Sequence, residues 1–303
     1  MRILIALALP FAALCQPEGG TLSRGLASES FSCGNLVQSC SGPARRFIEA
    51  KCGYVEGADG SRIQVPAIPA EGPDPADLFN DCSGPGHNPA PLDGLEPVEL
   101  DPDGTEITGH VFADNYFELY VNGKIVARDP IGFVPFNSSV VRFKAGGPAT
   151  YAVKLVDWGT HLGVGMEYDR WNVGDGGFIA AFSDGTVTGA DWKCKPFYIS
   201  PLDDATCVRP GPDSSACPER PACVERDPAD CSALHFPVPD DWAEPGFDDS
   251  DWLPASTYPA SAVTNQRAYR GYAEKFGDAS FIWSRNLDQD NLVLCRGRAA
   301  ASP

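Results

Sequence analysis

Hydrophobic and polar residues alternate along the middle of the chain, from Glu106 to Ser200. A period of two is typical of half-buried β-strands, whose successive side chains point to opposite faces of a sheet. Strands of this kind, joined by short turns, pack most readily as two facing antiparallel layers. We therefore predict a mainly β protein, an antiparallel β-sandwich, with strands at residues 116–127, 140–144, 151–156, 178–182 and 195–199.

The clearest local signal is a hairpin at residues 116–127, YFELYVNGKIVA. Phe117, Leu119 and Val121 are predicted to share one face, and the residues between them the other. Asn122-Gly123 suits a type I′ turn, because both central residues of that turn need positive φ angles. Asp184-Gly185 is a second tight-turn sequence, between two predicted strands.

The N-terminal part, residues 16–100, is predicted to be a cysteine-containing, loop-rich region with little strand character, wrapped around the sandwich. Ser41 with Pro43 favours a short helix as far as Lys51, since serine caps the free N–H groups and proline is tolerated in the first turn. A second short helix is predicted over residues 74–81. The sandwich begins with residues 101–200.

After residue 200 the pattern weakens. Residues 201–234 are predicted to be a cysteine-rich acidic insertion, and residues 235–303 the second part of the sandwich, with strands only at 281–284 and 291–296. Between Asp203 and Asp251 there are thirteen acidic residues and three arginines. The simplest interpretation is a solvated acidic surface that keeps the protein soluble.

Composition limits the partners. The chain has 303 residues, 31 glycines, 28 prolines and a net charge of −18. The glycine and proline content favours short strands and turns over long helices. The negative charge would repel a phosphate backbone or an anionic lipid surface, so neither nucleic acid nor membrane insertion is expected.

The first fifteen residues have the features of a secretion signal. Arg2 is followed by twelve apolar residues, too few to span a bilayer, and small residues precede a cleavage point before Gln16. The alternative is a bacterial lipid anchor on Cys15, although Leu14 occupies a position where such a motif has a small residue. We expect a secreted, extracellular or periplasmic protein.

Cysteine counting supports export. Without Cys15 ten cysteines remain, an even number that suits disulfides in an oxidising compartment. Cys194 and Cys295 lie in predicted strands and are expected to pair. The others form two quartets that should pair internally, with three connectivities open in each: Cys33, Cys40, Cys52 and Cys82, and Cys207, Cys217, Cys223 and Cys231.

Metal sites have weaker support. The chain lacks a CxxC pair, and its four histidines, among them His161, are scattered, which disfavours zinc. Oxygen ligands at Asp101, Asp103 and Glu106 would suit a structural calcium ion, but Asp-Pro-Asp-Gly is also an ordinary turn sequence. Apart from this calcium ion, no cofactor is expected.

Four segments together resemble the galactose-binding-like, jelly-roll β-sandwich domains appended to glycoside hydrolases such as rhamnosidases. They are ADNYFELYVNGKIV at 113–126, GGFIAAFSDGTVTGADWK at 176–193, WAEPGFDDSDW at 242–252 and FIWS at 281–284.

The resemblance implies that Trp242 and Trp252 plug the same sandwich interior as the Asn-Gly hairpin. In such domains the last two segments commonly precede the first, and here they follow it. A circular permutation would explain this order, because the two ends of a domain often lie close together.

The candidate ligand site is the loop 157–177, which combines aromatic, acidic and basic side chains with six glycines. A sugar is held by an aromatic face and by polar groups on its hydroxyls, and this loop has both. The alternative is that the aromatic side chains close the end of the core. The ligand candidates are Trp158, His161, Tyr168, Asp169, Arg170 and Trp171.

Asp114 and Asn115 precede the hairpin strand, where the resembling domains place a polar pair near a loop edge. They are candidates for ligand contact, or they hydrogen-bond the backbone of the neighbouring loop.

The acidic residues Asp248, Asp249 and Asp251 look like a catalytic cluster, but the resemblance makes them a turn between two core tryptophans. No Gly-x-Ser-x-Gly stretch or glycine-rich phosphate loop occurs. The sequence therefore predicts a non-catalytic protein that binds carbohydrate or a cell-surface or matrix component. A polysaccharide hydrolase or lyase using carboxylates, and a purely structural extracellular protein, are the alternatives.

Overall fold

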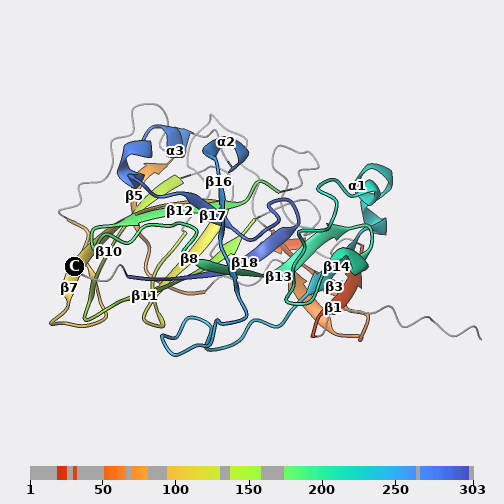
Figure 1. Cartoon of the computed structure of the whole chain (residues 1–303), viewed down its shortest axis with the longest axis horizontal. Coiled ribbons are helices and arrows are strands. Elements are labelled where there is room, and N and C mark those ends of the chain that lie inside the picture. Colours follow the sequence, from red (N-terminus) through yellow and green to blue (C-terminus); the bar gives the residue numbers. More distant parts are fainter. Residues whose placement is uncertain are drawn as a thin grey trace, which may run out of the picture.

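The computed structural model contains two large β-sheets, a small third sheet and a few short helices (Figure 1). Helices α2 (Ala260–Val263) and α3 (Arg267–Arg270) lie over the second sheet, and α1 (Ala222–Arg226) lies near the first. The described residues also include the 3₁₀ turns η6 (Ala205–Cys207), η7 (Pro228–Asp230) and η8 (Ala273–Phe276). The structure describes residues 19–25, 30–32, 51–65, 70–80, 94–129, 137–157, 174–263 and 267–299.

The first large sheet has eight antiparallel strands in the order β1-β14-β13-β18-β11-β8-β9, with β15 paired to β13. Every pairing in it is antiparallel, as expected from strands with alternating side chains. Its strands are β1 (Thr21–Arg24), β8 (Tyr116–Val121), β9 (Lys124–Arg128), β11 (Thr150–Val156), β13 (Lys193–Leu202), β14 (Ser232–His235), β15 (Leu253–Pro254) and β18 (Asp290–Arg298).

The second large sheet has seven strands in the order β16-β17-β12-β7-β10-β5, and β6 runs parallel to β10. Its strands are β5 (Ala76–Asn80), β6 (Val98–Glu99), β7 (Thr105–Asp114), β10 (Asn137–Ala145), β12 (Gly177–Phe182), β16 (Ser256–Tyr258) and β17 (Phe281–Trp283). The third sheet consists of β2 (Ser30–Ser32), β3 (Lys51–Glu56) and β4 (Arg62–Val65).

The two large sheets face each other across one apolar core, which confirms the predicted antiparallel β-sandwich. Side chains from both sheets alternate into this interior, because every second residue of a strand points the same way. The largest of them are Phe117, Tyr151 and Trp192 from the first sheet side and Phe143, Phe178 and Trp283 from the second.

The Asn-Gly hairpin is confirmed. Asn122 has a φ of 50° and Gly123 a φ of 80°, the two left-handed conformations that a type I′ turn requires. Leu119 and its two inward neighbours lie in the interior, whereas Tyr116 and Tyr120 point to the outer face of the first sheet. Both faces of this strand are buried.

The outer face of the first sheet carries a second apolar cluster, which holds Trp242 and Trp252. The sequence analysis placed these tryptophans in the interior with the hairpin, and this is wrong. They pack beside Tyr116 and Phe197, on the opposite side of the sheet from the main core. The small third sheet contributes Val55 and Val65 to the same cluster, so the first sheet is covered on both faces.

The N-terminal region contains more strand than predicted. Residues 76–80 form β5, paired with β10, where a helix over 74–81 was predicted. Lys51 begins β3 instead of ending a helix. Local helix preference is weak, and an available sheet edge overrides it when pairing buries a side chain such as Leu78.

Three disulfides agree with the predicted pairing. Cys194 of β13 is bonded to Cys295 of β18 within the interior. The C-terminal quartet pairs internally, as Cys207–Cys217 and Cys223–Cys231. Of the N-terminal quartet, the backbone of Cys52 lies in β3 and the other three lie outside the described residues, as do the predicted signal segment and the body of the predicted first helix.

Among the described residues, no helix is long and apolar enough to cross a membrane.

Candidate functional site

The loop predicted to bind a ligand lies mostly outside the described residues. Only Asp157 and residues 174–177, at its two ends, are described. The ligand roles predicted for Trp158, His161, Tyr168, Asp169, Arg170 and Trp171 therefore stay predictions.

Asp114 and Asn115 lie at the junction of β7 and β8, and both are buried. The Asn115 side-chain amide donates to Asp114 Oδ1 over 2.8 Å, and the Asn115 backbone N–H donates to the carbonyl of Val156. The first contact joins the two side chains and the second joins two backbones, so the predicted hydrogen bonds from these side chains to the loop backbone stay a prediction. Ligand contact at this pair also stays a prediction.

The calcium prediction concerned a turn before β7. There the Asp103 N–H donates to Asp101 Oδ1 over 3.1 Å, and Glu106 accepts from Arg142 Nε over 3.1 Å. Within the described ranges, no group of three or more His, Cys, Asp or Glu side chains is arranged to hold a metal ion. Calcium at this turn stays a prediction.

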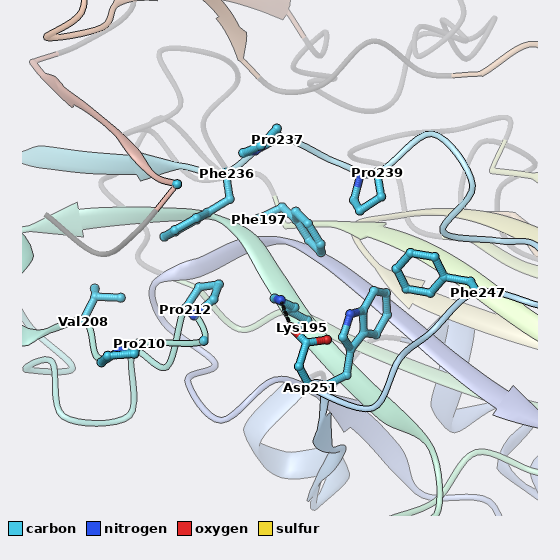
Figure 2. Close-up of a pocket in the computed structure, with 13 residues that line it drawn as sticks. Lys195, Phe197, Val208, Pro210, Pro212, Phe236, Pro237, Pro239, Phe247 and Asp251 are labelled. Atoms are coloured by element: carbon cyan, nitrogen blue, oxygen red, sulfur yellow. Dashed lines mark hydrogen bonds and ion pairs between the residues drawn. The ribbon is translucent and has the colours of Figure 1, made fainter.

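A groove of about 800 Å³ lies at the outer face of the first sheet, next to the cluster that holds Trp252 (Figure 2). This volume is within the range of small-molecule sites. Its walls come from chain segments far apart in sequence. They are Gly19, Lys195, Phe197, Val208, Pro210, Gly211, Pro212, Phe236, Pro237, Pro239, Phe247, Asp251 and Trp252. We call it the outer groove.

Aromatic rings form much of the outer groove. Trp252 lies edge-on to Phe197, with ring centroids 6.1 Å apart, and edge-on to Phe247 at 5.6 Å. Phe197 and Trp252 are buried, whereas Phe247 and Phe236 are half-buried. Figure 2 shows Phe236 and Phe247 on either side of Phe197. The buried pair thus fixes the floor, and the half-buried rings are accessible to a ligand.

An ion pair lies among these rings (Figure 2). Lys195 Nζ is 2.6 Å from Asp251 Oδ2. The Lys195 side chain is 17% exposed and that of Asp251 is 63% exposed, so the carboxylate is the accessible partner. The groove therefore offers hydrogen-bond acceptors beside apolar ring surface.

One wall of the groove belongs to residues 237–252, which we call the tryptophan segment. Arg296 of β18, almost fully buried, fixes it: its guanidinium donates to the carbonyls of Trp242 and Glu244 and to Asp249 Oδ2. Lys193 Nζ also donates to Asp249, over 2.8 Å. Asp249 thus joins two cations of the sheet to the segment.

The electrostatics of Asp249 follow from these contacts. Burial acts to raise the pKa of its carboxyl, but the hydrogen bonds from Lys193 and Arg296 outweigh burial and lower the pKa. Asp248 accepts from the Ser250 N–H in a turn. The structural interpretation of these two acids agrees with the structure, while Asp251 lines the groove, which the sequence analysis did not foresee.

The opposite wall is the loop 207–217, closed by the Cys207–Cys217 disulfide, which we call the proline loop. Arg209 and Asp213 exchange backbone hydrogen bonds across it. The Ser214 hydroxyl donates to Asp290 over 2.6 Å, and the Asn286 amide donates to the Ser214 carbonyl. The loop is therefore fixed to the body of the sandwich.

Asp290 is the buried centre of this attachment. Burial raises the pKa of its carboxyl to about 7, although hydrogen bonds from Ser214 and Ser284 act to lower it. Its backbone carbonyl also accepts from the indole of Trp283, over 2.8 Å.

Sequence reasoning missed the outer groove, since it treated residues 201–234 as a cysteine-rich acidic insertion without a ligand site. Two Pro-x-Pro pairs, at 210–212 and 237–239, and the Phe236-Pro237 step were the available signals. Prolines in this spacing stiffen a chain that lies along a sheet without joining it.

Beside Phe236, a polar pair joins β14 to β1: His235 Nε2 and Ser23 Oγ are 2.7 Å apart, and both residues are buried. Burial lowers the pKa of His235 to about 4. Between about pH 6.5 and pH 4, His235 is therefore protonated in the unfolded chain and neutral in the folded protein. The free energy of unfolding should fall as the pH falls through this window.

We expect wild type to lose up to about 3 kcal/mol more than His235→Gln between pH 7 and pH 4. Urea unfolding of both proteins at several pH values measures this difference. The two proteins must be compared with each other, because Asp290 has a raised pKa and so increases the stability as the pH falls through the same window. This contribution is present in both proteins and cancels in the difference. His110→Gln is the control, since half-buried His110 should give a smaller change. Parallel pH curves for wild type and His235→Gln would contradict the prediction.

No known protein family matches the chain, and comparison with curated proteins gives no match. Among solved structures, it is similar to the Streptomyces avermitilis α-L-rhamnosidase complexed with L-rhamnose, with a TM-score of 0.27 and 16% identity. The match covers 79% of this chain and 24% of the rhamnosidase chain, so this chain spans about a quarter of that protein. At this TM-score the likeness assigns neither fold nor activity, and the galactose-binding-like subtype stays a prediction.

Proposed function

We propose that the protein is an exported, non-catalytic carbohydrate-binding protein whose ligand lies in the outer groove. The observation that carries the proposal is the placement of the half-buried rings of Phe236 and Phe247 around the Lys195–Asp251 ion pair. Three disulfides are consistent with an oxidising compartment.

The chemistry of a sugar matches this lining. The C–H face of a pyranose packs on an aromatic ring, and its hydroxyls need donors and acceptors at the ring's edge. Asp251 supplies accepting oxygens and Lys195 supplies donors. A carboxylate held by an ammonium group accepts hydrogen bonds from hydroxyls, which suits recognition.

The walls are held in place before a ligand arrives. The tryptophan segment is tied to β18 through Arg296, and the proline loop is closed by a disulfide and bonded to Asp290. A pre-ordered site loses less conformational entropy on binding. This arrangement supports a rigid binding groove.

Replacing Phe247 with alanine is expected to weaken glycan binding by roughly tenfold, because one stacking surface of the groove is lost. A glycan array identifies a ligand, and calorimetry with that ligand measures the change. Phe79→Ala is the control: Phe79 is also half-buried, but it contacts Tyr272 beside the second sheet. Equal binding by wild type and Phe247→Ala would exclude this groove.

The double variant Trp158→Ala/Trp171→Ala tests the alternative location. If it abolishes binding while Phe247→Ala does not, the sugar binds the loop 157–177 instead. If no glycan on the array binds wild type, the carbohydrate proposal itself is wrong.

A further inference from the structure

We propose that the ligand of the outer groove is a glycan with free amino groups, and that Asp251 is the residue that contacts its ammonium. This inference rests on the proposed carbohydrate-binding function and specifies its ligand class. It is argued from the charge on the groove walls, the accessibility of Asp251 and the rings around it.

The tryptophan segment is strongly acidic. It contains six acidic residues and neither lysine nor arginine. The sheet beneath supplies three cations to it, Lys193 and Arg296 at Asp249 and Lys195 at Asp251. The acids outnumber these cations, and the wall therefore keeps a net negative charge. The acidic residues are Asp240, Asp241, Glu244, Asp248, Asp249 and Asp251.

Two further acids of the segment are next in sequence to residues that line the groove. Asp240 directly follows the lining residue Pro239, and Asp248 directly follows Phe247; both are exposed. The net negative charge of the whole tryptophan segment attracts cationic ligands and repels anionic ones, because the field of a surface is the sum of its charges. The groove should attract ammonium groups and repel uronate or sulfated sugars.

Asp251 has a second acceptor for such a ligand. Lys195 donates to its Oδ2, and among the described residues no other group is hydrogen-bonded to this carboxylate, so Oδ1 is available to a ligand. The side chain is also 63% exposed. A carboxylate has about four lone-pair sites, which allows it to accept from Lys195 and from a ligand together.

The aromatic rings favour the same ligand. A cation over an aromatic face is stabilised by the ring's quadrupole. The guanidinium carbon of Arg296 lies over the Phe247 ring, 5.3 Å from its centroid, so a ligand would contact the part of this half-buried ring that Arg296 does not cover. Carboxylate and ring together therefore form a surface for an ammonium group carried on an apolar pyranose face.

The experiment compares three oligosaccharides of equal length: a glucosamine oligomer, its fully N-acetylated counterpart and an oligogalacturonate. Calorimetry at pH 6, in low and high salt, measures each affinity. We expect the glucosamine oligomer to bind at least tenfold more tightly than the N-acetylated one, with affinity falling as salt rises. The oligogalacturonate should bind weakest.

Asp251→Asn should lower the affinity for the glucosamine oligomer about tenfold and that for the N-acetylated oligomer much less, because asparagine keeps one accepting oxygen but loses the negative charge. The protein carries a charge of −18, so non-specific attraction of any polycation is almost the same in this variant. Asp278→Asn, which removes one exposed acid next to η8, is the matched control and should change neither affinity.

Equal affinity for the two hexosamine oligomers would overturn the ammonium proposal and leave the carbohydrate proposal standing. An unchanged preference in Asp251→Asn would show that Asp251 is not the contacting residue. If none of these oligomers and no glycan on the array binds wild type, the carbohydrate proposal fails as well.

Discussion

Replacing both Cys194 and Cys295 with alanine is expected to lower the free energy of unfolding by about 5 kcal/mol. The two residues are 101 positions apart, and cross-linking a loop of this length removes much entropy from the unfolded chain. Both side chains also lie in the sandwich interior. Urea unfolding of the oxidised wild type and the double variant measures the difference.

The control is the double variant Cys207→Ala/Cys217→Ala. These cysteines are only 10 positions apart, so the loss should be smaller, roughly 3 kcal/mol. A loss equal to that of the Cys194–Cys295 pair, or larger, would show that loop length does not set the stabilisation. The variant also opens the proline loop of the groove, and its glycan affinity reports whether that wall must be closed.

Features that depend on residues adjacent in the sequence could be predicted from the sequence. The Asn122-Gly123 turn was predictable because only a few residues tolerate two successive positive φ angles, and it sets the pairing of the residues next to it, Val121 with Lys124. The Cys194–Cys295 bond was predictable because each cysteine lies alone in a strand-like segment. Strand alternation at Phe117 and Leu119 was predictable for the same local reason.

The position of the tryptophan segment could not be predicted in this way. Trp242 and Trp252 are apolar residues that must be buried, but the first sheet has two apolar faces, and the sequence does not say which face receives them. The choice is made by Arg296, whose guanidinium reaches the outer face and bonds the segment there. Likewise β5 is fixed by pairing with β10 rather than by its own residues.

The outer groove is a product of sheet order. Its lining runs from Gly19 to Trp252, and these residues meet because β1, β14 and β13 are neighbours in the first sheet. β1 and β14 pair although they are far apart in the chain, which no local pattern shows. The acidic residue of the groove, Asp251, was visible in sequence, but its pairing with Lys195 of β13 was not, because the two residues are far apart in the chain.

A large loss of stability is also expected when Asp249 is replaced. Asp249→Asn should destabilise the fold by about 3 to 5 kcal/mol, because Arg296 would keep its buried positive charge without a charged partner. The Arg296 side chain is only 2% exposed, so water cannot replace the carboxylate. The loss should appear as a lower urea midpoint with an unchanged slope.

Asp248→Asn is the matched control, since Asp248 is exposed, lies next to Asp249 in the chain and accepts from the Ser250 backbone in a turn. Its effect should be far smaller than that of Asp249→Asn, as for an ordinary surface substitution. If Asp249→Asn costs no more than this control, Arg296 is held by the carbonyls of Trp242 and Glu244 alone. Asp249 also positions the groove, because Phe247 and Asp251 belong to the tryptophan segment that it fixes. Asp249→Asn should therefore bind glycan more weakly than wild type even when it is folded. Glycan affinity measured at urea concentrations well below the unfolding midpoint tests this effect separately from stability.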